Sequence, residues 1–250
     1  MKVNYIDHMG TDLSVVNAAR VSFNKESEWE FRPDDEGDFD FRLSDRDKGL
    51  IQFLARGCTS GDWDAIMREV VLLDDTLSSI ETLLEILNHV KNMPTHWTPF
   101  GHTAITLHIK APIFVARQLG KHQVGFVWNE VSRRYVTDTP DFYVPEVWRY
   151  AAKDVKQGSQ EGGLAEMFVG GKDHNINCLS LYEELLDAGI CPEQARMVLP
   201  QSMHTEWYWT GNLYGFVNVF IQRTESHAQK EVRDVAHQIG EIIEPLFPVS

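Results

Sequence analysis

The sequence predicts an α+β fold: a single domain spanning residues 1–250, in which long helices flank a mixed sheet, with no Rossmann fold. Three observations lead to this class. Residues 102–109 alternate polar and apolar side chains, which is typical of a strand with one buried face. Residues 213–223 and 227–243 are long stretches that favour helices. Finally, the chain shows no repeated strand–helix rhythm and contains no GxGxxG motif.

The first third of the chain is predicted to begin with a strand, a turn at residues 9–12 and a helix, which together occupy residues 1–24. Residues 26–47 are rich in aspartate and include a proline and a glycine, so we expect an acidic loop there. Residues 49–55 are apolar and predict a short helix. Residues 62–93 carry leucine and isoleucine at three- and four-residue spacing, which predicts further helices.

The remainder continues with the strand at residues 102–109. Ala111-Pro112 follows it and predicts the start of a helix, because proline suits the first turn. Helices are then predicted at 179–186, 192–199, 213–223 and 227–243, and a strand at 203–209.

The composition argues against several classes of function. A formal net charge of -14 opposes broad binding to nucleic acid or to anionic membranes, because the average field repels both. No apolar run approaches the ~20 residues of a membrane span, and the N-terminus lacks the apolar stretch of a signal peptide. Three cysteines without CxxC spacing are typical of reduced thiols, so we expect a cytoplasmic protein, in the host cytoplasm if its source is viral.

Two neighbouring stretches, residues 117–123 and 129–135, stand out because cations gather there in a strongly acidic chain. Glu130 is the only acid in either stretch. A structural surface helix normally mixes acids among its bases. The local reversal of sign therefore predicts a site for an anion, phosphate above all, whereas a solvated basic face is the alternative.

Short blocks of sequence around this cluster, taken in chain order, resemble the flavin-dependent thymidylate synthases. These blocks are Asn17-Ala-Ala-Arg-Val-Ser22-Phe23, His96-Trp-Thr-Pro-Phe-Gly-His102, Arg196-Met-Val-Leu-Pro200, Trp209-Thr-Gly-Asn212 with Asn218, and Arg223-Thr-Glu-Ser-His227-Ala-Gln229. Five ordered blocks are more specific than any one of them. The resemblance covers roughly residues 10–24, 95–136 and 193–240.

The resemblance implies an enzyme that converts dUMP to dTMP by reductive methylation. In such enzymes methylenetetrahydrofolate supplies the carbon, and FAD that has been reduced by NADPH supplies the hydride. The partners implied are these small molecules rather than a nucleic-acid polymer or a membrane. The resemblance also implies a homotetramer whose active sites combine residues from several subunits.

The match to the family's motifs also implies site residues. Arg223 is expected to be catalytic, by stabilising charge on the uracil ring rather than by transferring a proton. The expected dUMP-binding residues are Gln118, Lys121, Glu130, Val131, Ser132, Arg133, Arg134, Arg196 and Arg223. The expected FAD-binding residues are Ser22, Thr98, Lys121, His122, Gln123, Glu130, Asn212, Tyr214, Asn218 and His227. No metal site is expected.

The sequence departs from the family at several of these positions. The usual signature is Arg-His-Arg, seven residues and then Ser, whereas here Lys121-His122-Gln123 is followed by eight residues and Ser132. Lysine keeps the charge but loses the planar fork, and glutamine loses the charge, which bears on flavin affinity. The extra residue predicts a π-bulge or a longer loop. Residues 62–93 form an insertion relative to the family.

Other interpretations stay open at this point. The chain could be a catalytically inactive relative that binds flavin and nucleotide. A metal hydrolase would draw its ligands from His96, His102, His108 and His122, although no HExxH or HxH motif completes a set. Cys191 precedes a predicted helix start, where a thiol can become a nucleophile, or it is simply a structural cysteine. Asn212 is also well placed as a helix N-cap without any ligand.

Overall fold

The computed structural model of the chain describes residues 1–33, 37, 39–55, 96–153, 158–165 and 170–250. The chain divides into two compact units that interleave in sequence. Unit 1 contains Met1–Asp7, Thr106–Gly211 and Gln222–Gly240, and unit 2 contains His8–Ile105, Asn212–Ile221 and Glu241–Ser250. The helices predicted within residues 62–93 lie outside the described residues.

Most of the four-stranded sheet belongs to unit 1. Its strand order is β1-β4-β8-β5, with β1 at Lys2–Met9, β4 at Ala104–Pro112, β8 at His204–Gly211 and β5 at Phe126–Glu130. β5 and β8 are antiparallel, and Glu130 lies opposite Trp207. In β4 the side chains of Ile105, Leu107 and Ile109 are fully buried, so the alternation in the sequence correctly predicted a half-buried strand.

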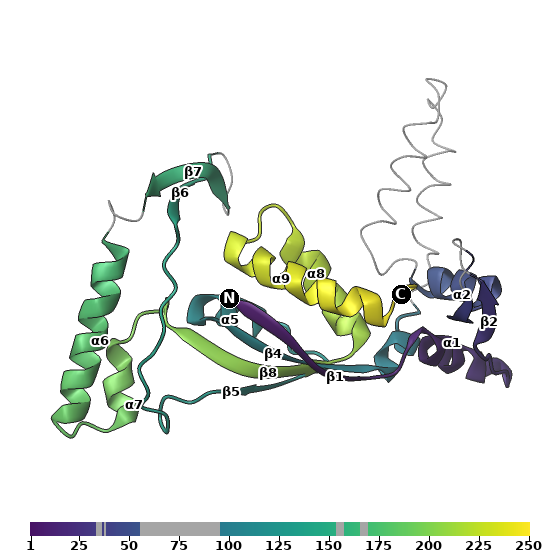
Figure 1. Cartoon of the computed structure of the whole chain (residues 1–250), viewed down its shortest axis with the longest axis horizontal. Helices are drawn as coiled ribbons and strands as arrows, with labels where there is room; N and C mark the ends of the chain where they lie inside the picture. Colours follow the sequence, from purple (N-terminus) through teal and green to yellow (C-terminus); the bar gives the residue numbers. More distant parts are fainter. Residues whose placement is uncertain (34–36, 38, 56–95, 154–157, 166–169) are drawn as a thin grey trace, which may run out of the picture. The chain divides into compact units, whose positions relative to one another are not determined.

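Two helices of unit 1 carry buried apolar faces. Figure 1 shows α9 (Lys230–Ile243) lying across one face of the sheet. Its fully buried residues follow helical spacing: Val232, Val235, Ala236 and Ile239. α5 (Ile113–Leu119) begins one residue after Pro112, which ends β4 and caps the helix instead of occupying its first turn. The predicted helix start at Ala111-Pro112 is therefore corrected by one to two residues.

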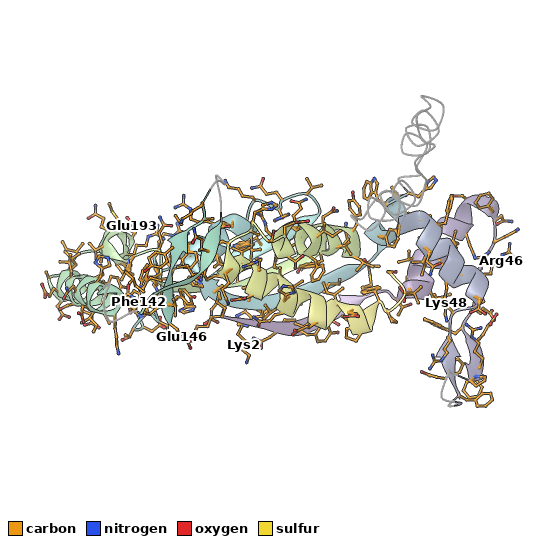
Figure 2. All side chains as sticks on the ribbon, turned by 90° about the horizontal axis from the view of Figure 1, so that it is seen from above. Lys2, Arg46, Lys48, Phe142, Glu146 and Glu193 are labelled. Atoms are coloured by element: carbon orange, nitrogen blue, oxygen red, sulfur yellow. The ribbon has the colours of Figure 1, made fainter. Side chains whose placement is uncertain are left out.

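The rest of unit 1 is a two-stranded ribbon and a pair of helices. β6 (Val147–Ala151) and β7 (Ser159–Ala165) are antiparallel, and a side chain at Gly163 would place its Cβ 1.9 Å from the carbonyl oxygen of Trp148. The helices are α6 (Gly171–Asp187) and α7 (Pro192–Ala195), and a 3-10 turn at Arg196–Val198 continues α7. Phe142, labelled in Figure 2, forms a bridge with Met203, which aligns the segment before β6 with the start of β8.

Unit 2 contains helices α1 (Asp12–Arg20), α2 (Asp45–Ala55) and most of α8 (Leu213–Thr224). Short 3-10 turns lie at Val21–Phe23, Thr98–His102 and Glu244–Leu246. Thr11 is the N-cap of α1, and its backbone N–H donates to the Ser14 hydroxyl at 3.0 Å. The strand–turn–helix order predicted for residues 1–24 is thus confirmed.

The acidic loop predicted at residues 26–47 is wrong for about half of that stretch. The structure has a hairpin there, β2 (Glu30–Pro33) paired with β3 (Phe39–Arg42), and α2 already begins at Asp45. Three phenylalanines pack on one another across the hairpin: Phe31, Phe39 and Phe41. We predicted a loop because the segment is rich in acidic residues. Its alternating aromatic residues, which stabilise paired strands, were the signal for the hairpin. Figure 2 labels Arg46 and Lys48 on α2.

The α+β class is confirmed, since the chain contains both helices and sheets. The strand pairs described here are antiparallel, whereas we expected a mixed sheet. The order β1-β4-β8-β5 also differs from that of a doubly wound parallel sheet. Within the described residues, no helix combines the length and the apolarity that a membrane span requires.

Candidate active site

Unit 1 contains a cleft of about 530 Å³, here called cleft A, at the end of α5. Five residues predicted for the site line it: Gln118, Lys121, His122, Gln123 and Glu130. Its walls also include the rings of Phe126, Trp128 and Trp209. The cleft therefore combines flat apolar surface with amide, imidazole and cationic groups, which is a suitable lining for a planar heterocycle.

Arg223, near the end of α8, forms hydrogen bonds with two residues that line cleft A. Its Nε donates a hydrogen bond to Nε2 of His122 at 2.9 Å, and its Nη2 donates to the carbonyl oxygen of Gln118 at 3.3 Å. Burial and the positive charge of Arg223 lower the pKa of His122 to about 4. At neutral pH the imidazole is therefore uncharged and accepts at Nε2, so two neutral acceptors hold the guanidinium without cancelling its charge.

The low pKa of His122 leads to a pH prediction. The unfolded chain takes up this proton near the ordinary value of 6.5, whereas the folded chain resists it down to about 4. Between these values the unfolded state binds more protons, so the free energy of unfolding decreases as pH falls through this window. We expect His122→Gln, which keeps a neutral acceptor, to weaken this pH dependence in urea titrations. An NMR titration that found the His122 imidazole titrating near 6.5 would contradict the prediction.

Glu130 belongs both to cleft A and to a second cleft of unit 1, cleft B, which has a volume of about 520 Å³. Its carboxylate is held from two sides: Trp128 Nε1 donates to Oε2 at 3.1 Å, and Thr205 Oγ1 donates to Oε1 at 2.7 Å. Trp128 in turn stacks on the buried ring of Trp207, with centroids 4.4 Å apart. Trp128 and Thr205 were not predicted from the sequence, because both positions depend on the pairing of β5 with β8, and β5 was not predicted.

Cleft B is lined by four of the residues predicted to bind dUMP: Glu130, Val131, Arg133 and Arg196. The guanidinium of Arg133 is tied to Asp138, through the carbonyl oxygen and the carboxylate. Arg134 lies on the same segment, where its Nε donates to the Ser132 hydroxyl at 3.1 Å. In the part of the chain that the structure describes, no carboxylate pairs with Lys121, Arg134 or Arg196. Their charges are thus not paired with a carboxylate among the described residues, and the anion site expected from the sequence remains a prediction.

The eight residues between Gln123 and Ser132 fold as a turn followed by β5. The turn closes at Gly125, whose φ of 77° lies in the left-handed region that favours glycine. A turn and a strand in this segment are consistent with the longer loop that we expected as one of two alternatives.

The other residues predicted to bind FAD lie mostly in unit 2. Ser22 and Thr98 line a cleft of about 740 Å³, here called cleft C. Tyr214 stacks on Trp97 with centroids 5.0 Å apart. Asn212 Oδ1 accepts from the Gly215 N–H at 2.8 Å, so this asparagine caps the start of α8, and Asn218 donates to the Tyr214 carbonyl oxygen at 2.9 Å. His227 is exposed and belongs to unit 1, between α8 and α9.

Three of the four histidines considered as metal ligands, all except His102, lie in different environments. His96 stacks on Phe53, His108 pairs with Glu206 at 3.1 Å, and His122 accepts from Arg223. Among the described residues, no group of three or more histidine, cysteine or acidic side chains is arranged to hold a metal ion. Cys191 is the exposed N-cap of the four-residue helix α7, as its place before a predicted helix start indicated.

The fold has well-matched relatives among solved structures. The UMP/dUMP methylase PolB from Streptomyces cacaoi, solved with 5-Br dUMP bound, superimposes with a TM-score of 0.69 at 27% sequence identity. The match covers 99% of this chain and 92% of that protein. A second structure of the same methylase, with 5-Br UMP bound, gives a TM-score of 0.65. The chain thus has the fold of a UMP/dUMP methylase.

Sequence comparison narrows this class to one family. The family profile described as thymidylate synthase complementing protein matches residues 4–249. The flavin-dependent thymidylate synthase of Thermotoga neapolitana is 32% identical over 247 residues, which cover 98% of this chain and 87% of that protein. That of Thermus thermophilus is also 32% identical, over 99% of this chain and 73% of the relative. The chain belongs to the flavin-dependent thymidylate synthase family.

Proposed function

We propose that this enzyme converts dUMP to dTMP by reductive methylation, with methylenetetrahydrofolate as the carbon donor and NADPH-reduced FAD as the hydride donor. The observation that carries the proposal is the placement of Arg223. A neutral histidine and a backbone carbonyl hold this cation at a cleft that has aromatic walls. A fixed cation at that position favours a uracil ring on which negative charge develops.

The residues of cleft A fit a flavin. Its isoalloxazine ring is planar, with apolar faces and hydrogen-bonding edges, and the cleft offers Trp128 together with Lys121, His122 and Gln123. Bound FAD supplies the hydride once it has been reduced. Lys121 retains one positive charge where the family commonly has two, and a nearby cation favours an anionic reduced flavin. Ser22, Thr98, Asn212, Tyr214, Asn218 and His227 are proposed as further FAD contacts on the family's pattern.

The unpaired cations fit the phosphate of dUMP. Arg134 and Arg196 lack carboxylate partners among the described residues, and Ser132 places a hydroxyl beside Arg134. Charged forks and hydroxyl donors are the groups that bind a phosphate monoester. Arg133, already tied to Asp138, is proposed as a weaker contact, and Val131, Gln118 and Glu130 as contacts to the rest of the nucleotide.

The proposal is tested by measuring dTMP after incubation of the FAD-loaded enzyme with dUMP, methylenetetrahydrofolate and NADPH. We expect dTMP only in the complete mixture, so that omission of either co-substrate abolishes it. Release of dTMP without NADPH, or its absence from the complete mixture when FAD and dUMP are both bound, would contradict the proposed reaction. The second result would favour the inactive relative.

Arg134→Ala should weaken dUMP binding by about 1.5–3 kcal/mol, because a hydrogen bond to a charged phosphate is lost. Isothermal titration of dUMP into the FAD-loaded protein measures this change. Arg32→Ala is a suitable control, since Arg32 forms an ion pair with Asp45 beside the β2–β3 hairpin and lines none of the three clefts. Equal affinities for Arg134→Ala and the unmodified protein would place the phosphate elsewhere.

The assembly and location follow the family's pattern. We expect a homotetramer with shared active sites, and a chain that acts as one domain, because the family match extends over residues 4–249. Light scattering should give four times the chain mass of 28.6 kDa, and a monomeric, active enzyme would refute the tetramer. A cytoplasmic location is proposed because the co-substrates are metabolites of that compartment.

A further inference from the structure

A buried carboxylate lies at the start of α9, outside the three clefts. Glu231 is only 3% exposed, and Arg149 Nη2 donates to both of its oxygens at 2.9 Å. Tyr143 Oη donates to Oε1 at 3.1 Å, and Gln229 Nε2 donates to Oε2 at 3.0 Å. Burial alone would raise the pKa of Glu231, but hydrogen bonds from the backbone, Arg149 and Gln229 lower it below its ordinary value. The side chain is therefore an ionised group that only accepts hydrogen bonds.

Because the Glu231 carboxylate can only accept hydrogen bonds, it fixes the orientation of the side-chain amides of Gln229 and Gln118. Gln229 must turn its NH₂ group towards Glu231, so its Oε1 faces the other way and accepts from Gln118 Nε2 at 2.6 Å. The second contact of Gln118 Nε2 is the Phe114 carbonyl oxygen, at 3.5 Å. The two ends of an amide are otherwise interchangeable in shape, and here the charge of Glu231 distinguishes them. In the described part of the chain, no donor is placed on Gln118 Oε1.

We infer that Glu231 is a positioning residue which, through Gln229, fixes Gln118 as a hydrogen-bond acceptor on the wall of cleft A. Gln118 lines this cleft. Its backbone carbonyl oxygen, as distinct from Oε1, accepts a hydrogen bond from Arg223. The wall therefore selects a ligand that presents an N–H or O–H group at this point, and it disfavours one that presents a lone pair.

This inference deepens the proposed function and rests on it for the identity of the ligand. In dUMP the donor is either the ring N3–H or a hydroxyl of the sugar. dCMP has a lone pair at N3, and it would meet the oxygen of Gln118 with an unfavourable contact if the ring lies there. The series of contacts from Glu231 through Gln229 to Gln118, here called the relay, can be tested without any ligand.

The ligand-free test uses Gln229→Glu. A carboxyl group can replace Gln229 in the relay only when it carries the proton that it donates to Glu231, so its pKa should be raised. A raised folded-state pKa adds stability at low pH that is lost as pH rises through that pKa. We therefore expect the loss of stability relative to the unmodified protein to be larger at pH 9 than at pH 5. Gln194→Glu, an exposed site on α7, is the control for the added charge. An equal loss of stability at pH 5 and at pH 9 for Gln229→Glu would contradict the relay.

The ligand test uses Gln229→Met, which cuts the relay but leaves the Arg149–Glu231 pair in place. Titration calorimetry of the FAD-loaded protein would compare dUMP with dCMP, 3-methyl-dUMP and 3′-deoxy-dUMP. We expect the preference for dUMP over at least one analogue to fall about tenfold in the variant, because a released amide can turn either end to the ligand. The affected analogue identifies the donor. Unchanged preferences for all three analogues would overturn the assignment of Gln118.

The two tests together separate the relay from the proposed function. If dUMP fails to bind the unmodified protein while Gln229→Glu still shows the pH effect, the proposed function is refuted and the relay remains supported.

Discussion

Arg223→Ala is expected to lower the rate of dTMP formation by roughly 100- to 1,000-fold, the usual cost of removing one electrostatic contact to the reacting group. The structure shows why this arginine is well suited to that role. Its guanidinium is held by the uncharged His122 and by the backbone carbonyl oxygen of Gln118, and among the described residues no carboxylate pairs with it. The measurement is the turnover rate at saturating dUMP, methylenetetrahydrofolate and NADPH.

Two companion variants sharpen this prediction. Arg223→Lys keeps the charge but loses the Nε–H that meets His122, so we expect partial activity. Arg32→Ala removes an arginine away from the clefts and should leave turnover unchanged. The FAD content and the urea midpoint of Arg223→Ala should stay close to those of the unmodified enzyme. Full activity of a well-folded Arg223→Ala variant would refute the assignment.

Glu231→Ala is expected to destabilise the fold by about 3–5 kcal/mol, because it leaves the charge of Arg149 without its carboxylate partner in a poorly hydrated position. The side chains of Glu231 and Arg149 are 4% and 22% exposed, so solvent screens this pair little. Urea unfolding of the unmodified and variant proteins measures the change. The pair also joins the β6–β7 ribbon to α9, since Arg149 lies in β6 and Glu231 in α9. Within the ribbon, Arg149 Nε donates to Ser159 Oγ at 2.8 Å.

The double variant Glu231→Leu with Arg149→Met is the matched comparison. Replacing both members of a buried pair by apolar residues is often neutral, so we expect it to recover most of the lost stability. A loss below ~1 kcal/mol for Glu231→Ala would be typical of an exposed ion pair and would show that the pair is hydrated.

The parts of the fold that the sequence predicted are those with a strong local period. β4 alternates over a full strand and α9 repeats its apolar residues at helical spacing, so each could be recognised from neighbouring residues alone. β5, β6 and β7 were missed because Val127 and Trp148 are exposed and Gly163 interrupts the pattern. Those strands exist because of their partners rather than their own composition.

The same distinction holds for the site. The cluster around His122 could be located because its residues are close in sequence and opposite in sign to the rest of the chain. The contacts that orient it could not be predicted, because they join distant positions. Thr205 reaches Glu130 across 75 residues, Gln229 reaches Gln118 across 111, and Glu231 reaches Arg149 across 82. Only the folded chain brings these groups together.

One anaerobic experiment tests the proposed reaction. The FAD-loaded enzyme would be reduced with NADPH, and its visible spectrum followed while dUMP and methylenetetrahydrofolate are added. We predict that the flavin absorption bands disappear on reduction and return only when both are present, with one dTMP formed for each flavin reoxidised. A protein that takes up no FAD, or a flavin that is reoxidised without formation of dTMP, would contradict the function proposed for this enzyme.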